Sequence, residues 1–187
     1  MEDENVNLTK LWIERFVIGL RLCPFAHFSF YNGTIYYDVS GSLQMKDCKN
    51  DLWELILKMK HTKPDVISNS FLLYDPSLSF HFMLDLKERV DALLVKKSVD
   101  EEFQIVVFHP DFQFGDEEFH ASGNFTNRSP LPTIHILRVD EVAHAIDVTE
   151  DVDEIPFRNK RVLENLNIKK ISEVFEDDFM EKIKPYI

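Results

Sequence analysis

The sequence predicts a single α/β domain in which helices pack on a small mixed sheet. Short β-rich segments alternate with helical stretches of about 10 to 20 residues, an order that favours right-handed crossovers and a partly parallel sheet. The chain has 187 residues, of which 44% are hydrophobic and 29% charged, and this composition suits one globular domain with a full core. A ferredoxin-like α+β sandwich is the nearest alternative, because the predicted sheet is small.

The first half of the chain is predicted to form two helices and two strands. Apolar residues recur at three- and four-residue intervals from Leu8 to Leu20, which predicts a helix with one buried face. Pro24 is expected to end this helix at about Leu22. The elements expected next are a strand over 35–39, a helix over 51–60 and a strand over 70–74.

The second half is predicted to add one long helix, two strands and helical segments near the C-terminus. The long helix is amphipathic and runs from Phe82 to about Lys97. Residues 103–108 are almost wholly apolar and β-rich, which predicts a central strand covered on both faces. A strand over 133–137 and a short helix over 141–147 complete a motif-bearing core of about 8–148, which is followed by an acidic helical segment of about 149–187.

The charge and the residue counts exclude several classes of function. Lys and Arg number 21 and Asp and Glu number 33, so the formal net charge is −12. This excess repels phosphate backbones and anionic lipid, and we expect binding to neither nucleic acid nor membranes. The five glycines give no GxGxxG or GxxxxGK[ST] spacing. Because the start is acidic and there are only two cysteines, we expect a soluble, cytoplasmic protein.

Half of the net negative charge lies in the C-terminal quarter of the chain. From Asp140 onward the chain carries 13 acidic and 7 basic residues, a net charge of −6. This segment is either a docking surface for a basic partner or a solvated face around a few apolar side chains, namely Val162, Leu163, Leu166 and Ile168.

The segment between Phe108 and Pro132 carries most of the candidate chemistry. It joins two predicted strands without helical or strand periodicity, and loops of this length are usually functional or disordered. Its four phenylalanines favour a packed loop. It begins with His109-Pro110-Asp111 at the carboxyl end of the predicted central strand, the edge at which open α/β sheets bind ligands.

Three separated motifs stand out in the chain, and they are the segments Leu22 to Ala26, Phe108 to Phe114 and Asn127 to Arg138, with a shorter one at Arg158-Asn159. In this order they resemble the signature segments of an uncharacterised family, catalogued as domain of unknown function 1415. The resemblance spans the chain from about Trp12 to about Leu166. It implies a compact α/β domain with no established activity, so it marks positions and names no reaction.

Cys23 is the candidate nucleophile, since a thiolate needs only a nearby His or Arg to form. It lies just past the carboxyl end of the first predicted helix, where the helix dipole disfavours an anion. The alternative is a small buried cysteine. Cys48 has no motif around it and is expected to be structural.

His109 and His135 are the candidate acid–base residues, because imidazole titrates near neutral pH. His135 stands between Ile134 and Ile136 in a predicted strand, so its side chain faces opposite to theirs. With Asp111 and His120 these histidines offer ligand types for zinc or iron. No HxH or HxxxH spacing links them, so we expect no metal and assign no cofactor.

Arg128 is the main candidate for binding a substrate. Its guanidinium stands in a turn with Asn127 and Ser129, and it has the geometry to clamp a carboxylate or phosphate. Asp111 and Arg138 complete the predicted binding set. The alternative is an ion pair that fixes the loop, with Asp111, Asp116 or Glu118 as the acidic partner.

The sequence therefore leaves three functions open. The first is binding or transformation of a small anionic metabolite at a cleft lined by Cys23, His109 and Arg128. The second is a non-catalytic interaction domain whose motifs are structural and whose acidic segment meets a basic protein partner. The third is a metalloenzyme built on the histidines.

Overall fold

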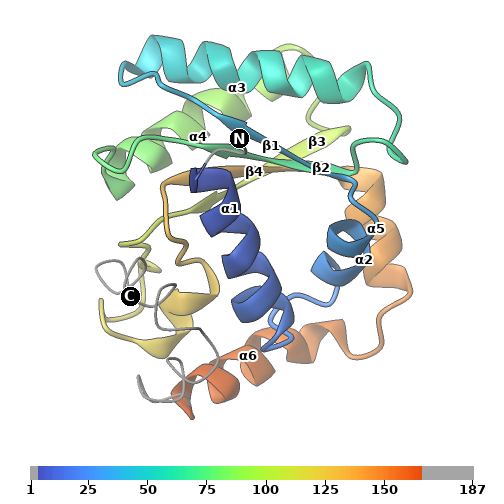
Figure 1. Cartoon of the computed structure of the whole chain (residues 1–187), viewed down its shortest axis with the longest axis vertical. Coiled ribbons are helices and arrows are strands. Elements are labelled where there is room, and N and C mark those ends of the chain that lie inside the picture. Colours follow the sequence, from blue (N-terminus) through green and yellow to red (C-terminus); the bar gives the residue numbers. More distant parts are fainter. Residues whose placement is uncertain (1–3, 166–187) are drawn as a thin grey trace.

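A four-stranded mixed sheet forms the centre of the computed structural model, which describes residues 4–165 (Figure 1). The strands are β1 (Ile35–Val39), β2 (Asn69–Leu73), β3 (Phe103–Phe108) and β4 (Thr133–Arg138), in the order β1-β2-β4-β3. β1 and β2 are parallel, and β4 is antiparallel to both β2 and β3. The predicted α/β domain with a small mixed sheet is confirmed. Its connectivity differs from the β-α-β-β-α-β order of a ferredoxin-like sandwich.

Helices cover both faces of this sheet, so the molecule has three layers (Figure 1). α3 (Met45–Lys60) and α4 (Phe80–Lys96) pack their apolar sides on one face. α1 (Glu4–Leu11) continues into a π-helix, η1 (Trp12–Ile18), and both pack on the other face. There the Trp12 ring meets the rings of Phe71 and Phe108 edge-on, with centroids 6.5 and 5.3 Å apart.

β4 shows how the alternation of a strand supplies both layers. Ile134 and Ile136 are fully buried in the core formed with α3 and α4. His135 points to the opposite face, where its ring stacks on that of Phe71 at 4.0 Å between centroids. The predicted orientation of His135, opposite to the two isoleucines, is confirmed.

The prediction that residues 103–108 form the central strand is wrong. β3 lies at one edge of the sheet, and its Gln104 is exposed. The central, wholly buried strand is β2, and β4 inserts between it and β3. The apolar composition of a strand indicates that helices cover its faces, but it does not indicate which strands lie on either side of it.

Several helices differ from the sequence-based prediction. α3 begins at Met45, six residues before the predicted start at Asp51. The short helix α2 (Ala26–Tyr31) was not predicted, because six residues are too few to show a helical period. α5 (Val139–Asp147) matches the predicted short helix, and α6 (Ile155–Glu164) lies inside the predicted acidic helical segment. The part of that segment after Asn165 lies outside the described residues.

Within residues 4–165, no helix is both long and apolar enough to cross a membrane.

Candidate functional site

The long connection from β3 to β4 is packed around its own polar side chains. Asn124 is fully buried in the 3-10 helix η2 (Ser122–Thr126). Its Oδ1 accepts the Phe114 N–H at 2.9 Å, and its Nδ2 donates to the carbonyls of Glu118 and Phe119 at 2.8 and 3.1 Å. These hydrogen bonds satisfy backbone groups that have no helix or sheet partner in this irregular segment.

Arg128 has only 4% of its surface exposed. Its Nε donates to the Phe112 carbonyl at 3.2 Å, and its Nη2 donates to the Phe119 carbonyl at 2.6 Å. The guanidinium also lies 4.6 Å from the ring centroids of both Phe119 and Phe125. Burial lowers the pKa of Arg128, while the charge of Asp111 acts in the opposite direction. The guanidinium therefore fixes the loop by donating to carbonyls and packing on aromatic rings. The sequence had instead suggested a carboxylate as its partner.

His109 bridges two loops through both nitrogens of its ring. Its Nε2 lies 2.9 Å from the carbonyl of Leu78 in the β2–α4 loop, and its Nδ1 accepts the Asp111 N–H at 2.9 Å. This pair of contacts requires the neutral tautomer with the proton on Nε2. Burial lowers the pKa of His109, which favours that neutral form. Both positions needed for proton transfer are thus occupied by backbone groups.

The remaining residues of the loop set also bond to the protein itself. Asn127 Nδ2 donates to the Val107 carbonyl at 3.4 Å, and the buried Ser129 donates its hydroxyl to the Leu131 carbonyl at 2.6 Å. Asp111 is exposed. His109, Asn127, Arg128 and Ser129 are therefore brought close together, and their hydrogen bonds hold a turn in place.

His135 and Arg138 lie away from this loop. The Nε2 of His135 is 3.0 Å from Asn69 Oδ1, and the apolar surroundings of the ring lower its pKa to about 3. Arg138 donates from Nη2 to the carbonyls of Met59 and Thr62 at 2.6 and 2.7 Å, and from Nε to that of Ile67 at 3.1 Å. It thereby caps the end of α3 and fixes the loop before β2.

The predicted binding residues do not all lie together, because Arg138 stands at the opposite end of β4 from the loop of Arg128. Thr133 pairs with Phe108, next to His109, whereas Arg138 pairs with Phe103. Five residues of an extended strand separate these ends by about 17 Å. A ligand that contacts the loop of Arg128 therefore does not also reach Arg138.

Cys23 is partly buried, as predicted, but its setting differs from the prediction. It precedes α2 as well as following η1, and the backbone N–H groups of Phe25 and Ala26 act on its thiol. These groups lower the pKa of the thiol, but desolvation is the larger effect and the pKa is raised overall. Desolvation is therefore the largest effect that opposes the thiolate.

α6 holds the segment before Cys23 in place. Asn159 is buried and donates its Nδ2 to the Leu22 carbonyl at 2.6 Å, and Arg158 Nη2 donates to the Arg21 carbonyl. Arg21 has a left-handed backbone with φ of 56°, which a non-glycine residue adopts at a cost. The Arg158-Asn159 motif was visible in the sequence, but its carbonyl partners were not.

A separate pocket of about 640 Å³ lies between β1 and α3. This pocket was not predicted from the sequence, although Ser40-Gly41-Ser42 directly follows a predicted strand and so marks a carboxyl-end loop. In the part of the chain that the structure describes, no three His, Cys, Asp or Glu side chains lie close enough to hold a metal ion.

Comparison with protein families finds one match that covers most of the chain. Residues 4–173 match the model of a family described as "Protein of unknown function (DUF1415)". No curated protein and no solved structure matches the chain.

Proposed function

We propose that this chain, which belongs to the DUF1415 family, is a protein-interaction domain. Its binding face consists of α5 and the start of α6. The partner supplies a basic amphipathic segment. The observation that carries the proposal is the combination of exposed apolar side chains and one-sided charge over residues 139–157. This stretch holds seven Asp and Glu residues before α6 and no Lys or Arg.

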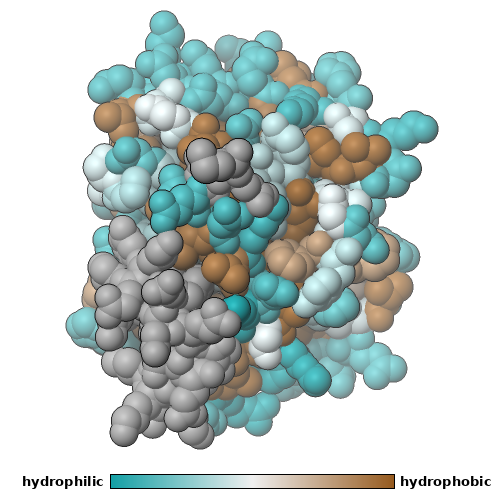
Figure 2. All heavy atoms as spheres, in the orientation of Figure 1, coloured by the Kyte–Doolittle hydropathy of each residue, from teal (hydrophilic) through white to brown (hydrophobic). Residues whose placement is uncertain are grey.

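The apolar part of this face consists of side chains that the fold leaves in solvent. Ile146, Val148 and Phe157 are 43%, 67% and 67% exposed. α5 has no buried residue, although its apolar side chains fall on one side. Apolar groups also reach the surface in Figure 2 on the right-hand side, the side on which Figure 1 places α5. Apolar surface of this kind with a polar rim is typical of protein interfaces.

The rim of the face determines what partner it suits. Asp140 and Glu141 stand in the first turn of α5, and Asp153 and Glu154 lead into α6. Carboxylates around an apolar centre favour a helix with apolar residues on one side and Lys or Arg on the other. They disfavour a second copy of this chain, whose own net charge is −12.

The internal bonding of the motif residues supports a non-catalytic role. His109, Arg128 and Arg138 bond to backbone carbonyls and amides, and the ring of His135 faces Asn69. Groups held in this way stabilise a surface, and they are not available to a substrate without a rearrangement.

The test uses a model peptide with a Lys/Leu amphipathic helix, followed by fluorescence anisotropy. We expect saturable binding to the wild type and a loss of at least about tenfold in affinity in Ile146→Ser/Phe157→Ser, since exposed anchors carry most of such affinity. Val66→Ser/Val95→Ser removes equally exposed side chains from other surfaces (61% and 63%) and should bind like the wild type.

Three results would contradict the proposal. The first is a Glu/Leu peptide of the same pattern that binds as tightly as the Lys/Leu peptide. The second is a control variant that loses as much affinity as Ile146→Ser/Phe157→Ser. The third is self-association of the wild type through this face in sedimentation equilibrium. Circular dichroism of both variants checks that they are folded.

A second candidate is a small-anion site at Cys23, with Arg158 in place of Arg128 as the cation. It is favoured by the two amides at Cys23 Sγ, and by the buried Arg158 Nε, which has no hydrogen-bond partner among the described residues. Phosphate should then slow the iodoacetamide alkylation of Cys23 in the wild type and not in Arg158→Gln. Arg161→Gln, on the exposed side of the same helix, is the control. If phosphate has no effect on the wild type, this candidate is wrong.

A further inference from the structure

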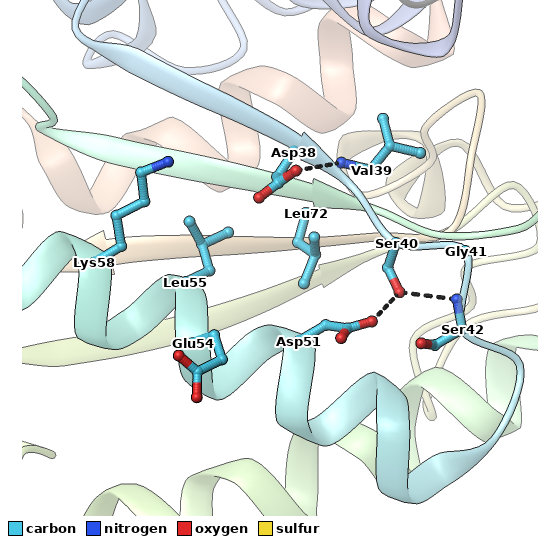
Figure 3. A pocket seen from close by; sticks show the side chains of 10 residues that line it. All are labelled: Asp38, Val39, Ser40, Gly41, Ser42, Asp51, Glu54, Leu55, Lys58 and Leu72. Carbon is cyan, nitrogen blue, oxygen red and sulfur yellow. Dashed lines mark hydrogen bonds between the residues drawn. The ribbon is translucent and has the colours of Figure 1, made fainter.

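The pocket between β1 and α3 has a shape and lining suited to a small molecule (Figure 3). Its volume of about 640 Å³ falls within the usual range for ligand sites. Leu55 and Leu72, which are 3% and 2% exposed, form an apolar floor, and Val39 adds an apolar wall at the rim. The pocket stands at the carboxyl end of an edge strand, where the chain leaves β1 for α3.

The loop that closes the pocket is held by hydrogen bonds. The hydroxyl of the buried Ser40 donates to Asp51 Oδ2 at 2.6 Å and accepts the Ser42 N–H at 3.2 Å. Its backbone N–H also donates to the Leu73 carbonyl at 2.8 Å, so the loop continues the pairing of β1 with β2. The Asp51 carboxylate is thus fixed in position by a residue that is itself buried.

The charged groups of the lining are three carboxylates and one ammonium. Asp38, Asp51 and Glu54 are negative and Lys58 is positive, which gives the lining a net charge of −2. The Lys58 ammonium lies 3.7 Å from the ring centroid of Tyr36 and donates to its hydroxyl. In Figure 3 this ammonium is directed toward the strand and away from Asp51 and Glu54. It therefore leaves these two carboxylates without a cation in the pocket.

We propose that this pocket binds an organic cation, namely a primary ammonium carried on a small apolar group. The ammonium would contact the carboxylates at the rim, and the apolar group would cover Leu55 and Leu72. The field of a chain with net charge −12 raises the local concentration of cations and repels anions. This site and the α5–α6 face are built from different elements, so each proposal stands or fails without the other.

The test uses benzylamine as the probe and the methyl resonances of Val39, Leu55 and Leu72 as the readout. We expect saturable shifts with benzylamine, and an affinity roughly three- to tenfold lower for benzyl alcohol, which has the same shape and no charge. The benzylamine affinity should also fall as NaCl is raised, because salt screens charges at the rim.

The variant for this site is Asp38→Asn/Glu54→Gln, which changes two exposed side chains of the lining. It should weaken benzylamine binding by roughly three- to tenfold. Asp85→Asn/Glu88→Gln makes the same change of net charge on exposed positions of α4 and should leave binding within about twofold.

Each of the following results would overturn the proposal: benzyl alcohol or benzoate binding as tightly as benzylamine, equal weakening in the two double variants, or no methyl shift at all. Saturable shifts with MgCl₂ or CaCl₂ that compete with benzylamine would assign the pocket to an inorganic cation and would likewise overturn it.

Discussion

At the scale of single residues, the polar side chains of the motifs serve mainly to satisfy the backbone of irregular segments. Arg128 and Arg138 together donate to five carbonyls, and Asn159 donates to a sixth. Removing a donor from a buried carbonyl costs more than the bond contributes, because the carbonyl is left without water. These residues are therefore expected to matter first for stability.

Arg128→Ala should lower the free energy of unfolding by about 2–4 kcal/mol, since one buried and one part-buried carbonyl lose a charged donor and two rings lose a cation. Arg128→Lys should recover only part of this, because an ammonium cannot reproduce the planar fork. Urea denaturation measures both. Lys87→Gln, in a partly exposed pair with Asp91, is the control and should stay within about 0.5 kcal/mol. An unchanged midpoint for Arg128→Ala would refute the structural role.

His135 should remain neutral well below the pH at which exposed histidines titrate, because its pKa is lowered to about 3. The unfolded chain binds a proton near pH 6.5 that the folded chain does not, so stability falls as the pH falls through this window. Relative to His135→Phe, which keeps a ring on Phe71, the wild type should lose up to about 1.4 kcal/mol per pH unit below 6.5.

NMR titration of the imidazole protons checks this directly. The His135 resonance should not move between pH 8 and pH 5. A His135 midpoint near pH 6.5 would contradict the lowered pKa.

At the scale of elements, the π-helix η1 sets the path of the chain into the Cys23 segment. The Gly19 N–H donates to the Glu14 carbonyl at 3.0 Å, and the Leu22 N–H donates to that of Val17 at 2.8 Å, both over five residues. A Cβ on Gly19 would lie 2.2 Å from the Arg15 carbonyl oxygen. The absence of a side chain at Gly19 thus permits this wider winding.

Gly19→Ala should therefore destabilise the protein by at least about 1 kcal/mol, because the backbone oxygen of Arg15 must move. Gly115→Ala is the matched control, since a Cβ there meets no atom within 4 Å, and it should be neutral or stabilising by less than about 1 kcal/mol. Thermal denaturation compares the two. Equal melting temperatures would show that the helix adjusts without cost.

The elements also show how far the sequence could predict the fold and the site. Periodicity predicted the long helices and all four strands, because each has one or two faces against a core. The edge position of β3 depends on which strand pairs with β4, and no local pattern carries that information. For Arg128 the sequence left a bound anion or an ion pair open, and its hydrogen-bond partners are backbone carbonyls, which every residue type supplies equally.

At the scale of the whole molecule, the net charge of −12 opposes the compact state. Salt screens this repulsion over about 10 Å at 0.1 M. Raising NaCl from about 0.02 to 0.2 M should therefore increase the melting temperature by a few degrees. Differential scanning calorimetry provides the measurement. A melting temperature that falls with salt would mean that ion pairs such as Lys160–Glu117 outweigh the repulsion.

The π-helix has one more consequence, which concerns the length of the chain. Each turn of η1 contains more residues than an α-helical turn. Deleting one residue between Trp12 and Ile18 would let the segment close as an ordinary α-helix with little rotation of the residues that follow, because a π-turn holds one residue more than the α-turn it would become. Leu22 would then keep its carbonyl near the Asn159 side chain that donates to it. An added residue would instead turn the following segment by about 100° around the axis, so the protein should tolerate a deletion between Trp12 and Ile18 better than an insertion.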